Sequence, residues 1–288
     1  MTWQLLLTAY LILGTAAYLI RRKLAQTLTK HNRLVNGFFF IAVLYPLGLI
    51  VASFSSPNLS IGWLNVVFLA AGSGIFPLIN LLPFRANKDV DAGLYTILNN
   101  LTPIITIVAA SLLLQERLND QQLLGAAIII TSTFLATLPR LQKRSASSST
   151  GMLFALASVS LLGLAIVYER WMLTRIDFGA YLVFGWGAQT LWMSVLAWPE
   201  RKNIKILREK KNFLPILSYG VTNAFKGLCF VAALKLSGNA SVVGAFASFM
   251  AVMVVLSAYF ILNEKEGLLF KIGAALIGTF GLIILNTA

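Results

Sequence analysis

The sequence has little with which to cover a surface that faces water. Only 11% of its 288 residues are charged, 58% are hydrophobic, and the mean hydropathy is +0.81. A soluble domain carries about 25% charged residues. This deficit excludes a water-soluble protein, because too few polar side chains remain to cover its surface.

The sequence also has only one cysteine, Cys229, and one histidine, His31. A single cysteine cannot form an intrachain disulfide, and Cys229 lies in an apolar run where its thiol is expected to pack. One histidine cannot supply a histidine-based metal site or catalytic group. We therefore expect a protein that is not an enzyme and that uses no cofactor or metal ion.

What the sequence does contain is a series of long apolar runs. Each can cross a bilayer as a helix, which takes about 20 residues. The runs lack the alternation of barrel strands, so helices must satisfy the backbone in lipid. We predict an all-α integral membrane protein with ten transmembrane helices. The predicted spans are Trp3–Ile20, Leu34–Ser53, Ile61–Leu82, Val90–Leu114, Gln121–Leu138, Gly151–Tyr168, Gly179–Trp198, Phe213–Leu236, Ser241–Leu262 and Leu268–Leu285.

The two halves of the chain repeat each other. Six residues of the first half, Leu114, Glu116, Gly125, Ala126, Ala127 and Thr131, have identical counterparts 148 positions later. Because each half has five spans, an odd number, the second half must enter the membrane in the opposite direction. The sequence therefore predicts two inverted five-helix repeats, residues 1–138 and 151–288, joined by a linker at 139–150.

The net charge of +13 is distributed unevenly among the predicted loops. Loops after the odd-numbered spans contain 17 Lys and Arg residues, whereas the other loops contain three, or four with Lys235 at the end of the eighth span. Cytoplasmic loops carry the excess of positive charge, so both termini are predicted outside the cytoplasm. We expect a monomer in the inner or plasma membrane, with the bilayer and a small solute as partners and no nucleic acid.

A short acidic turn precedes the final span of each half. The two turns and the helices that follow them read LLLQERLNDQQLLGAAIII and FILNEKEGLLFKIGAALIG. Together with the two five-span halves, these motifs resemble the EamA-type transporters of the drug/metabolite transporter superfamily, over essentially the whole chain. The resemblance implies a solute carrier with alternating access, whose cavity is lined by the first, third and fourth spans of each half. It also implies cytoplasmic termini, in contrast to the charge distribution.

Lys226 is the main candidate for binding a solute. It lies near the centre of the eighth predicted span, where a charged side chain costs about 2.5–3.5 kcal/mol. The residues that share its helical face are Tyr219, Thr222, Asn223 and Phe230. We interpret Lys226 as a cation in a cavity, where it binds a carboxylate or phosphate of a small metabolite such as an amino acid. The alternative is a lysine that extends along the helix to the membrane interface.

Two other spans carry polar faces. The fourth span has Tyr95, Asn99, Thr102 and Thr106, with Asn100 beside them, and Pro103 is expected to loosen this helix. The seventh has Tyr181, Gln189 and Trp192 on one face, with Trp186 near mid-depth. Hydrogen bonding between helices is the alternative role for these side chains. The predicted substrate-binding residues are Lys226, Asn223, Thr222, Tyr219, Tyr95, Asn99, Asn100, Thr102, Gln189 and Trp186.

No acidic residue falls in the middle of a predicted span. Glu116 and Glu264 lie in turns, where we expect them to cap or anchor the turn in contact with water. A carrier driven by protons through a buried carboxylate would need an acidic residue within a span. We therefore expect a carrier working by facilitated diffusion or exchange. The competing functions are a flippase for lipid-linked substrates and a membrane subunit of a larger complex.

Overall fold

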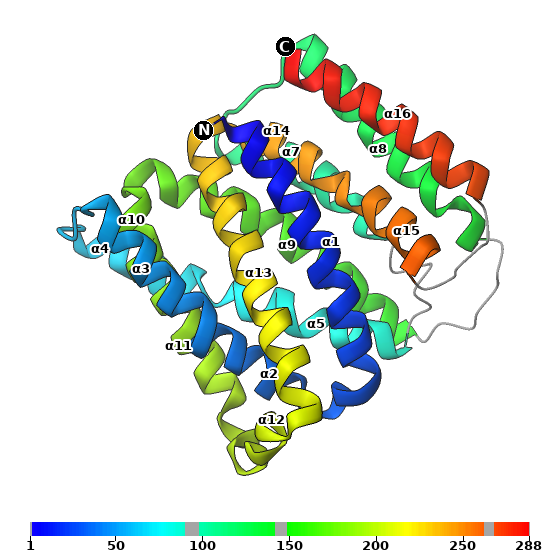
Figure 1. Ribbon diagram of the computed structural model, residues 1–288. Coiled ribbons are helices and arrows are strands. Elements are labelled where there is room, and N and C mark those ends of the chain that lie inside the picture. The colour runs from blue at the N-terminus through cyan, green and yellow to red at the C-terminus, as the bar shows by residue number, and fades with distance from the viewer. Residues whose placement is uncertain (1, 90–97, 142–148, 262–267, 288) are drawn as a thin grey trace.

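The computed structural model describes residues 2–89, 98–141, 149–261 and 268–287, which form helices joined by short connections (Figure 1). No strand occurs within these ranges. The helices of the first half are α1 (Trp3–Leu28), α2 (Asn32–Phe38), α3 (Tyr45–Ser55), α4 (Trp63–Gly72), α5 (Ile75–Asp89), α7 (Leu101–Leu113) and α8 (Asp120–Leu141). Those of the second half are α9 (Ser149–Arg175), α10 (Phe178–Ala180), α11 (Trp186–Ala197), α12 (Lys205–Arg208), α13 (Lys210–Ser237), α14 (Ala240–Ser248), α15 (Met250–Ile261) and α16 (Leu268–Thr287).

Many of these helices are suited to a bilayer. In the described chain, five helical segments are long and apolar enough to cross a membrane: Trp3–Leu24, Asn32–Ser55, Trp63–Pro83, Thr150–Arg175 and Lys211–Ser237. Large apolar side chains on the outside are freely exposed, as at Phe54 (85%) and Leu269 (84%). Such a surface suits lipid rather than water. The prediction of an all-helical membrane protein is therefore confirmed.

Two of the predicted spans contain a π-helical segment. Phe39–Leu44 joins α2 to α3, and Tyr181–Gly185 joins α10 to α11. Single π-helical turns are rare in helices and occur often at functional sites. Both segments lie beside the interior of the molecule, because Phe40 and Tyr181 are fully buried.

Two further spans are broken at corresponding positions of the two halves. The described part of the fourth span turns at Asn100 before α7 begins, and in the ninth span Phe249 separates α14 from α15. The sequence suggests that Pro103 loosens a continuous helix, but the structure differs. Pro103 lies in the first turn of α7, where a proline removes no helical hydrogen bond.

The last helices of the two halves, α8 and α16, pack against each other in opposite directions (Figure 1). Gly125 lies against Leu285, and Ser132 lies against Gly278. Because the residue numbers rise along α8 while they fall along α16, the two helices are antiparallel. A Cβ atom on Gly125 would lie 2.8 Å from the backbone nitrogen of Leu285. The absence of a side chain at Gly125 therefore allows the close approach of the two backbones.

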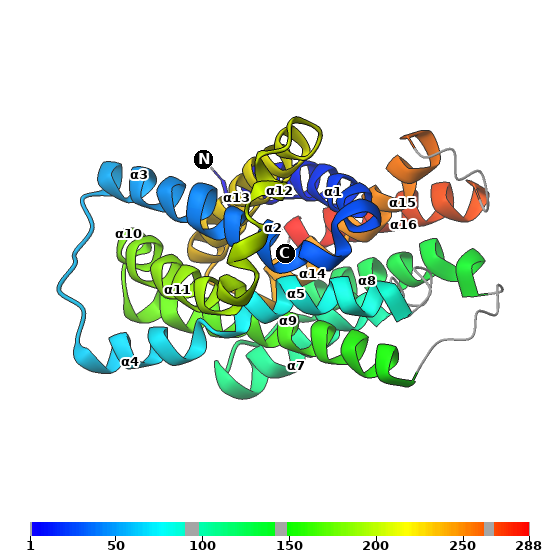
Figure 2. The same ribbon diagram turned by 90° about the horizontal axis from the view of Figure 1, so that it is seen from below.

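The other helices also pair across the two halves (Figure 2). Helix α1 packs on α13, and α5 packs on α9. Helix α7 packs on both α9 and α14, while α1 contacts α15. Helices from both halves therefore surround one shared interior.

Candidate functional site

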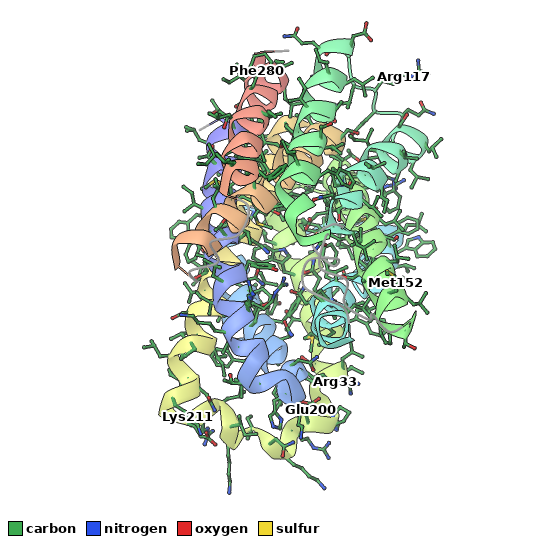
Figure 3. All side chains as sticks on the ribbon, turned by 90° about the vertical axis from the view of Figure 1, so that its right-hand side faces the viewer. Arg33, Arg117, Met152, Glu200, Lys211 and Phe280 are labelled. Carbon is green, nitrogen blue, oxygen red and sulfur yellow. The ribbon has the colours of Figure 1, made fainter. Side chains whose placement is uncertain are left out.

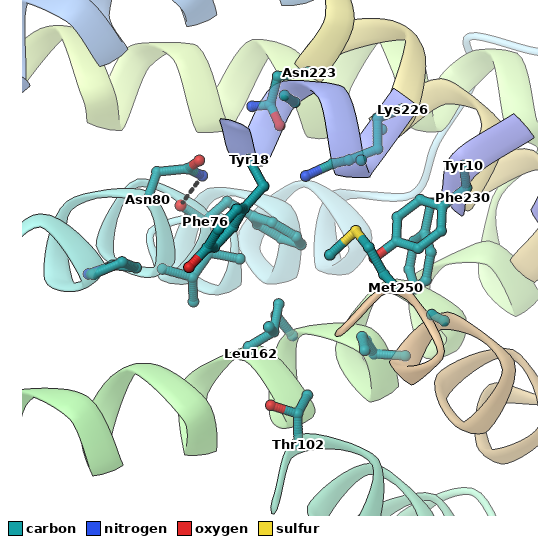
Figure 4. Close-up of a pocket in the computed structure, with 18 of the residues that line it drawn as sticks. Tyr10, Tyr18, Phe76, Asn80, Thr102, Leu162, Asn223, Lys226, Phe230 and Met250 are labelled. Atoms are coloured by element: carbon teal, nitrogen blue, oxygen red, sulfur yellow. Dashed lines mark hydrogen bonds between the residues drawn. The ribbon is translucent and has the colours of Figure 1, made fainter. Parts of the chain in front are cut away.

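A cavity of about 300 Å³ lies in this interior, between the two halves (Figure 4). Its volume is at the lower end of the range for small-molecule sites. Helices α1, α5 and α7 of the first half line it, together with α9, α13 and α14 of the second half. These helices belong to the first, third and fourth apolar segments of each half. Phe39 and Phe40 of the first π-helical segment, together with α11 and α15, complete the wall.

Lys226 reaches the cavity from α13, and Figure 4 shows its side chain extending into the open space beside Asn223. Gly14 of α1 makes room for it, because a Cβ atom there would lie 3.3 Å from Lys226 Cδ. No hydrogen bond or ion pair joins the Lys226 ammonium group to any residue that the structure describes. Arg21 lines the same cavity, so its wall on α1 and α13 carries two basic side chains.

Of the other residues predicted on this face of α13, Tyr219, Asn223 and Phe230 line the cavity. Thr222 does not, and its hydroxyl group donates to the carbonyl of Ser218 at 2.6 Å. It lies about 60° round the helix from Tyr219, on the side away from Asn223. The structure therefore places Thr222 outside the described wall of the cavity.

In the fourth span, Asn99, Asn100 and Thr102 line the cavity, whereas Tyr95 lies outside the described residues. The hydroxyl oxygen of Thr102 is buried and has no hydrogen-bond partner in the described structure. Thr106, one turn further on, has its hydroxyl 3.0 Å from the Thr102 carbonyl and 3.4 Å from that of Gly163. Thr106 therefore joins helices, while Thr102 is available to a ligand.

In the seventh span, Trp186 and Gln189 line the cavity. Trp192 does not share their environment, although the sequence places it on one face with Gln189. Its indole N–H donates to the carbonyl of Ala70 at 2.6 Å, on the exposed side of α11. Trp192 lies about 60° from Gln189 around the helix, and this rotation is enough to turn it towards α4.

Glu169 is the residue that the sequence analysis missed. It lines the cavity from α9, and its side chain is buried. The sequence analysis placed Glu169 just beyond the end of the sixth span, whereas the structure places it inside α9. The predicted sixth span stops at Tyr168, but α9 continues to Arg175. The signal in the sequence was the apolar stretch that follows Glu169, from Trp171 to Leu173, which extends the helix beyond the charge.

At one end of the molecule, a carboxylate joins the two halves. Glu116, in the turn after α7, accepts a hydrogen bond from the Ala240 backbone N–H at 2.7 Å and pairs with Arg170 Nε at 3.0 Å. It therefore caps α14 of the other half rather than its own turn, and it is mostly shielded from water. Glu264, its counterpart in the repeat, lies outside the described residues.

Two more contacts strengthen the same end. Asp177 caps α10 through the Ala180 N–H at 2.8 Å and accepts the Asn58 N–H of the first half at 2.9 Å. Lys235, near the end of α13, donates to the Leu173 carbonyl near the end of α9 at 2.7 Å. In the described chain the opposite end has one ion pair between the halves, Arg33 with Glu200, at 3.7 Å (Figure 3).

Comparisons with known proteins identify the family. The model of the EamA-like transporter family matches residues 2–138 and 149–287. A protein known from a crystal structure superposes with a TM-score of 0.71 at 16% sequence identity, covering 98% of this chain and 95% of the other. No curated protein matches the sequence. Because the family model matches both halves, the chain belongs to the EamA-like transporter family, as its two acidic turn motifs predict, and is a membrane transporter of the drug/metabolite type.

Proposed function

We propose that the protein is a monomeric solute carrier with ten membrane spans, arranged as two inverted five-helix repeats, residues 1–138 and 151–288. Equivalent helices of inverted repeats run in opposite directions, and α8 and α16 do so. A pseudo-two-fold axis also exchanges the contacts between the halves. Helix α1 (first span of the first half) packs on α13 (third span of the second half). In the same way, α9 (first span of the second half) packs on α5 (third span of the first half).

The transport mechanism in this proposal is alternating access around the shared cavity. Broken helices at corresponding places in the two halves are typical of carrier binding sites, and the breaks at Asn100 and Phe249 fit this rule. The cavity extends along α1 to Arg21, towards the end of that helix, while Glu116 and Arg170 close the opposite end. By the distribution of positive charge, this arrangement is open towards the cytoplasm and closed on the outer side.

The cargo that fits this site is a small metabolite with a carboxylate or phosphate group. The observation that carries this assignment is the Lys226 ammonium group, which faces a cavity between the two halves and has no anionic partner in the described structure. A charge removed from water is stabilised when a ligand supplies its counter-ion. Asn223, Thr102 and Gln189 line the same space and offer hydrogen bonds to the rest of the molecule.

A thermal-stability screen of the purified protein against small anionic metabolites tests this proposal. Ligands that stabilise the wild type should not stabilise Lys226→Met, and counterflow of the same ligands in proteoliposomes should be lost with them. Lys235→Met is the matched control, because it removes a lysine from the same helix but outside the cavity. Equal stabilisation of the wild type and Lys226→Met would show that the assignment of Lys226 is wrong.

A further inference from the structure

Glu169 is a buried acidic side chain that the proposed anion site does not use. Only 5% of the residue is exposed, and no Lys or Arg within the described residues lies at ion-pair distance from its carboxyl group. Ionisable groups inside membrane spans are costly, and those that occur commonly mark ion pathways or proton relays. The position of Glu169 in the cavity wall therefore requires an explanation beyond packing.

A chain of two hydrogen bonds between neutral side chains fixes one carboxyl oxygen of Glu169. Tyr181 donates its hydroxyl hydrogen to Glu169 Oε1 at 2.7 Å, and Gln189 Nε2 donates to the Tyr181 oxygen at 3.3 Å. The π-helical segment Tyr181–Gly185 holds this tyrosine in place, because the ring lies directly over Gly185, where a Cβ atom would be 2.8 Å from Tyr181 Cε2. Glu169 is thus oriented by one neutral donor, the Tyr181 hydroxyl group, while it remains part of the cavity wall.

The titratable groups around Glu169 come from three other elements. Tyr181 contacts it directly, and the basic groups of the same cavity are Lys226 on α13 and Arg21 on α1. The remaining titratable side chains in the cavity wall are Tyr10, Tyr18 and Tyr219. Cavity-lining residues of α5, α7 and α14 include no titratable side chain in the described structure. On α9 itself, Tyr168 donates to the Phe68 carbonyl and Arg170 pairs with Glu116.

We propose that Glu169 is a proton-binding site within the cargo cavity, and that its protonation is linked to the binding of an anion at Lys226. The carboxylate takes up one proton from water in the cavity and becomes a neutral carboxylic acid, which still accepts the Tyr181 hydrogen bond. This removes a negative charge from the space that an anionic cargo must enter. The proposal rests on the proposed function, because it takes Lys226 as the anion site.

Linkage makes the effect reciprocal: if protonation of Glu169 strengthens anion binding, anion binding must strengthen protonation to the same extent. A typical coupling between two sites corresponds to about a tenfold change in affinity. A carrier built in this way moves its anion together with a proton. It would therefore respond to a proton gradient, contrary to the expectation drawn from the sequence.

Infrared difference spectra of the full chain in lipid nanodiscs, recorded over a pH series, test the proton site without knowledge of the cargo. The wild type should show a carboxylic-acid C=O band that grows as the pH falls, and Glu169→Gln should lack this band. Glu200→Gln, which removes a carboxyl group at the opposite end from Glu116, should retain it. If Glu169→Gln does not fold, Tyr181→Phe replaces it, and loss of the donated hydrogen bond should move the band to higher frequency.

Sulfate binding tests the linkage, because sulfate keeps its charge across the pH series. At constant ionic strength set with sodium chloride, sulfate should bind the wild type about tenfold more tightly below the Glu169 transition than above it. The affinity of Glu169→Gln for sulfate should not change across the Glu169 transition. Glu200→Gln should behave as the wild type.

The two experiments separate this inference from the proposed function. In one outcome, sulfate binding depends on Lys226 but not on pH, and the infrared spectra of the wild type and Glu169→Gln are the same. This result would overturn the proton site but not the proposed anion carrier. That result is expected if Glu169 stays charged to bind a cationic group of the cargo. A Glu169 band without sulfate binding to the wild type would instead overturn the anion site at Lys226.

Discussion

At the residue scale, two threonines one turn apart on α7 have different roles. Thr106 Oγ1 is bonded to backbone carbonyls, whereas the buried Thr102 Oγ1 has no partner in the described structure. A buried hydroxyl group without a partner is costly, by about 1–3 kcal/mol. Nothing in the described packing offsets this cost for Thr102. A ligand in the cavity would offset it, because the residue lines the wall.

We therefore predict that Thr102→Val and Thr106→Val separate affinity from stability. Thr102→Val loses no internal hydrogen bond, so its melting temperature should hold, while affinity for the metabolite found in the screen should fall about three- to tenfold. Thr106→Val should lower stability by about 1 kcal/mol with affinity unchanged. Melting curves and ligand titrations of both variants measure the two effects. Equal loss of affinity in both would contradict a role for the Thr102 hydroxyl group in binding.

The sequence was sufficient to identify Lys226 but not Glu169. A lysine in the middle of an apolar run stands out, because burying its charge in a bilayer is costly and no neighbouring residue in the run can pair with it. Glu169 lies near the end of an apolar run, where charged residues are common, and a hydropathy boundary drawn one residue earlier places it in a loop. Only the length of α9 and the hydroxyl group of Tyr181, twelve residues later, show that it is inside.

At the element scale, apolar runs predict where helices lie but not where they break. The π-helical segment Tyr181–Gly185 and the break at Phe249 form in strongly apolar sequence without a proline, whereas Pro46 follows the segment Phe39–Leu44 in the first turn of α3. They depend on packing against helices far away in the chain, as when Thr190 approaches the Phe40 carbonyl at 3.3 Å. Such contacts are not visible in local periodicity, which explains why the broken spans were expected to be continuous.

The α8–α16 pair provides a prediction about packing. Gly125→Leu places a side chain against the backbone of Leu285 and should lower stability by about 1–3 kcal/mol, as overpacking does in tight interiors. Gly273→Leu, on α16, is the matched control, because no atom lies within 4 Å of a Cβ atom there. Melting temperatures in the same lipid nanodiscs compare them. A Gly125→Leu protein as stable as Gly273→Leu would argue against the close approach of α8 and α16.

Glu116 provides a prediction about closure. Glu116→Gln retains an acceptor for the Ala240 N–H but loses the ion pair with Arg170. Charged hydrogen bonds contribute about 1.5–3 kcal/mol, so the closed end should open at least about tenfold more often. In a Cys229→Ser background, Ser241→Cys reports this, since Ser241 is buried next to Glu116 and should react faster with a water-soluble maleimide.

The control for this measurement is Glu209→Gln. Its carboxylate pairs with Lys211 at the exposed start of α13, so labelling at position 241 should not change. Faster labelling in both variants would indicate general loosening of the protein rather than opening at Glu116. Unchanged labelling in Glu116→Gln would show that the ion pair does not hold this end closed.

At the scale of the whole molecule, aromatic–arginine pairs mark both ends of the membrane-spanning region. Arg175 lies over the Trp171 ring at 4.3 Å from its centroid, at the end of α9. Arg201 lies over the Trp198 ring at 4.5 Å, at the end of α11. Tryptophan is enriched at both membrane interfaces, so these two pairs fit positions at opposite surfaces of the bilayer. In Figure 1 both chain ends lie near the upper edge, while α12 and its basic loop lie at the lower edge.

The orientation of the chain is where charge distribution and family resemblance disagree, and cysteine labelling decides between them. In a Cys229→Ser background, Ser60→Cys reports the exposed loop after α3, and Asn203→Cys reports the basic loop after α11. If Lys and Arg set the orientation, an impermeant maleimide should label position 60 in intact cells and position 203 only after permeabilisation. The reverse pattern would place both termini in the cytoplasm. It would also turn the end closed by Glu116 inward, so that the structure would represent the outward-open state of the carrier.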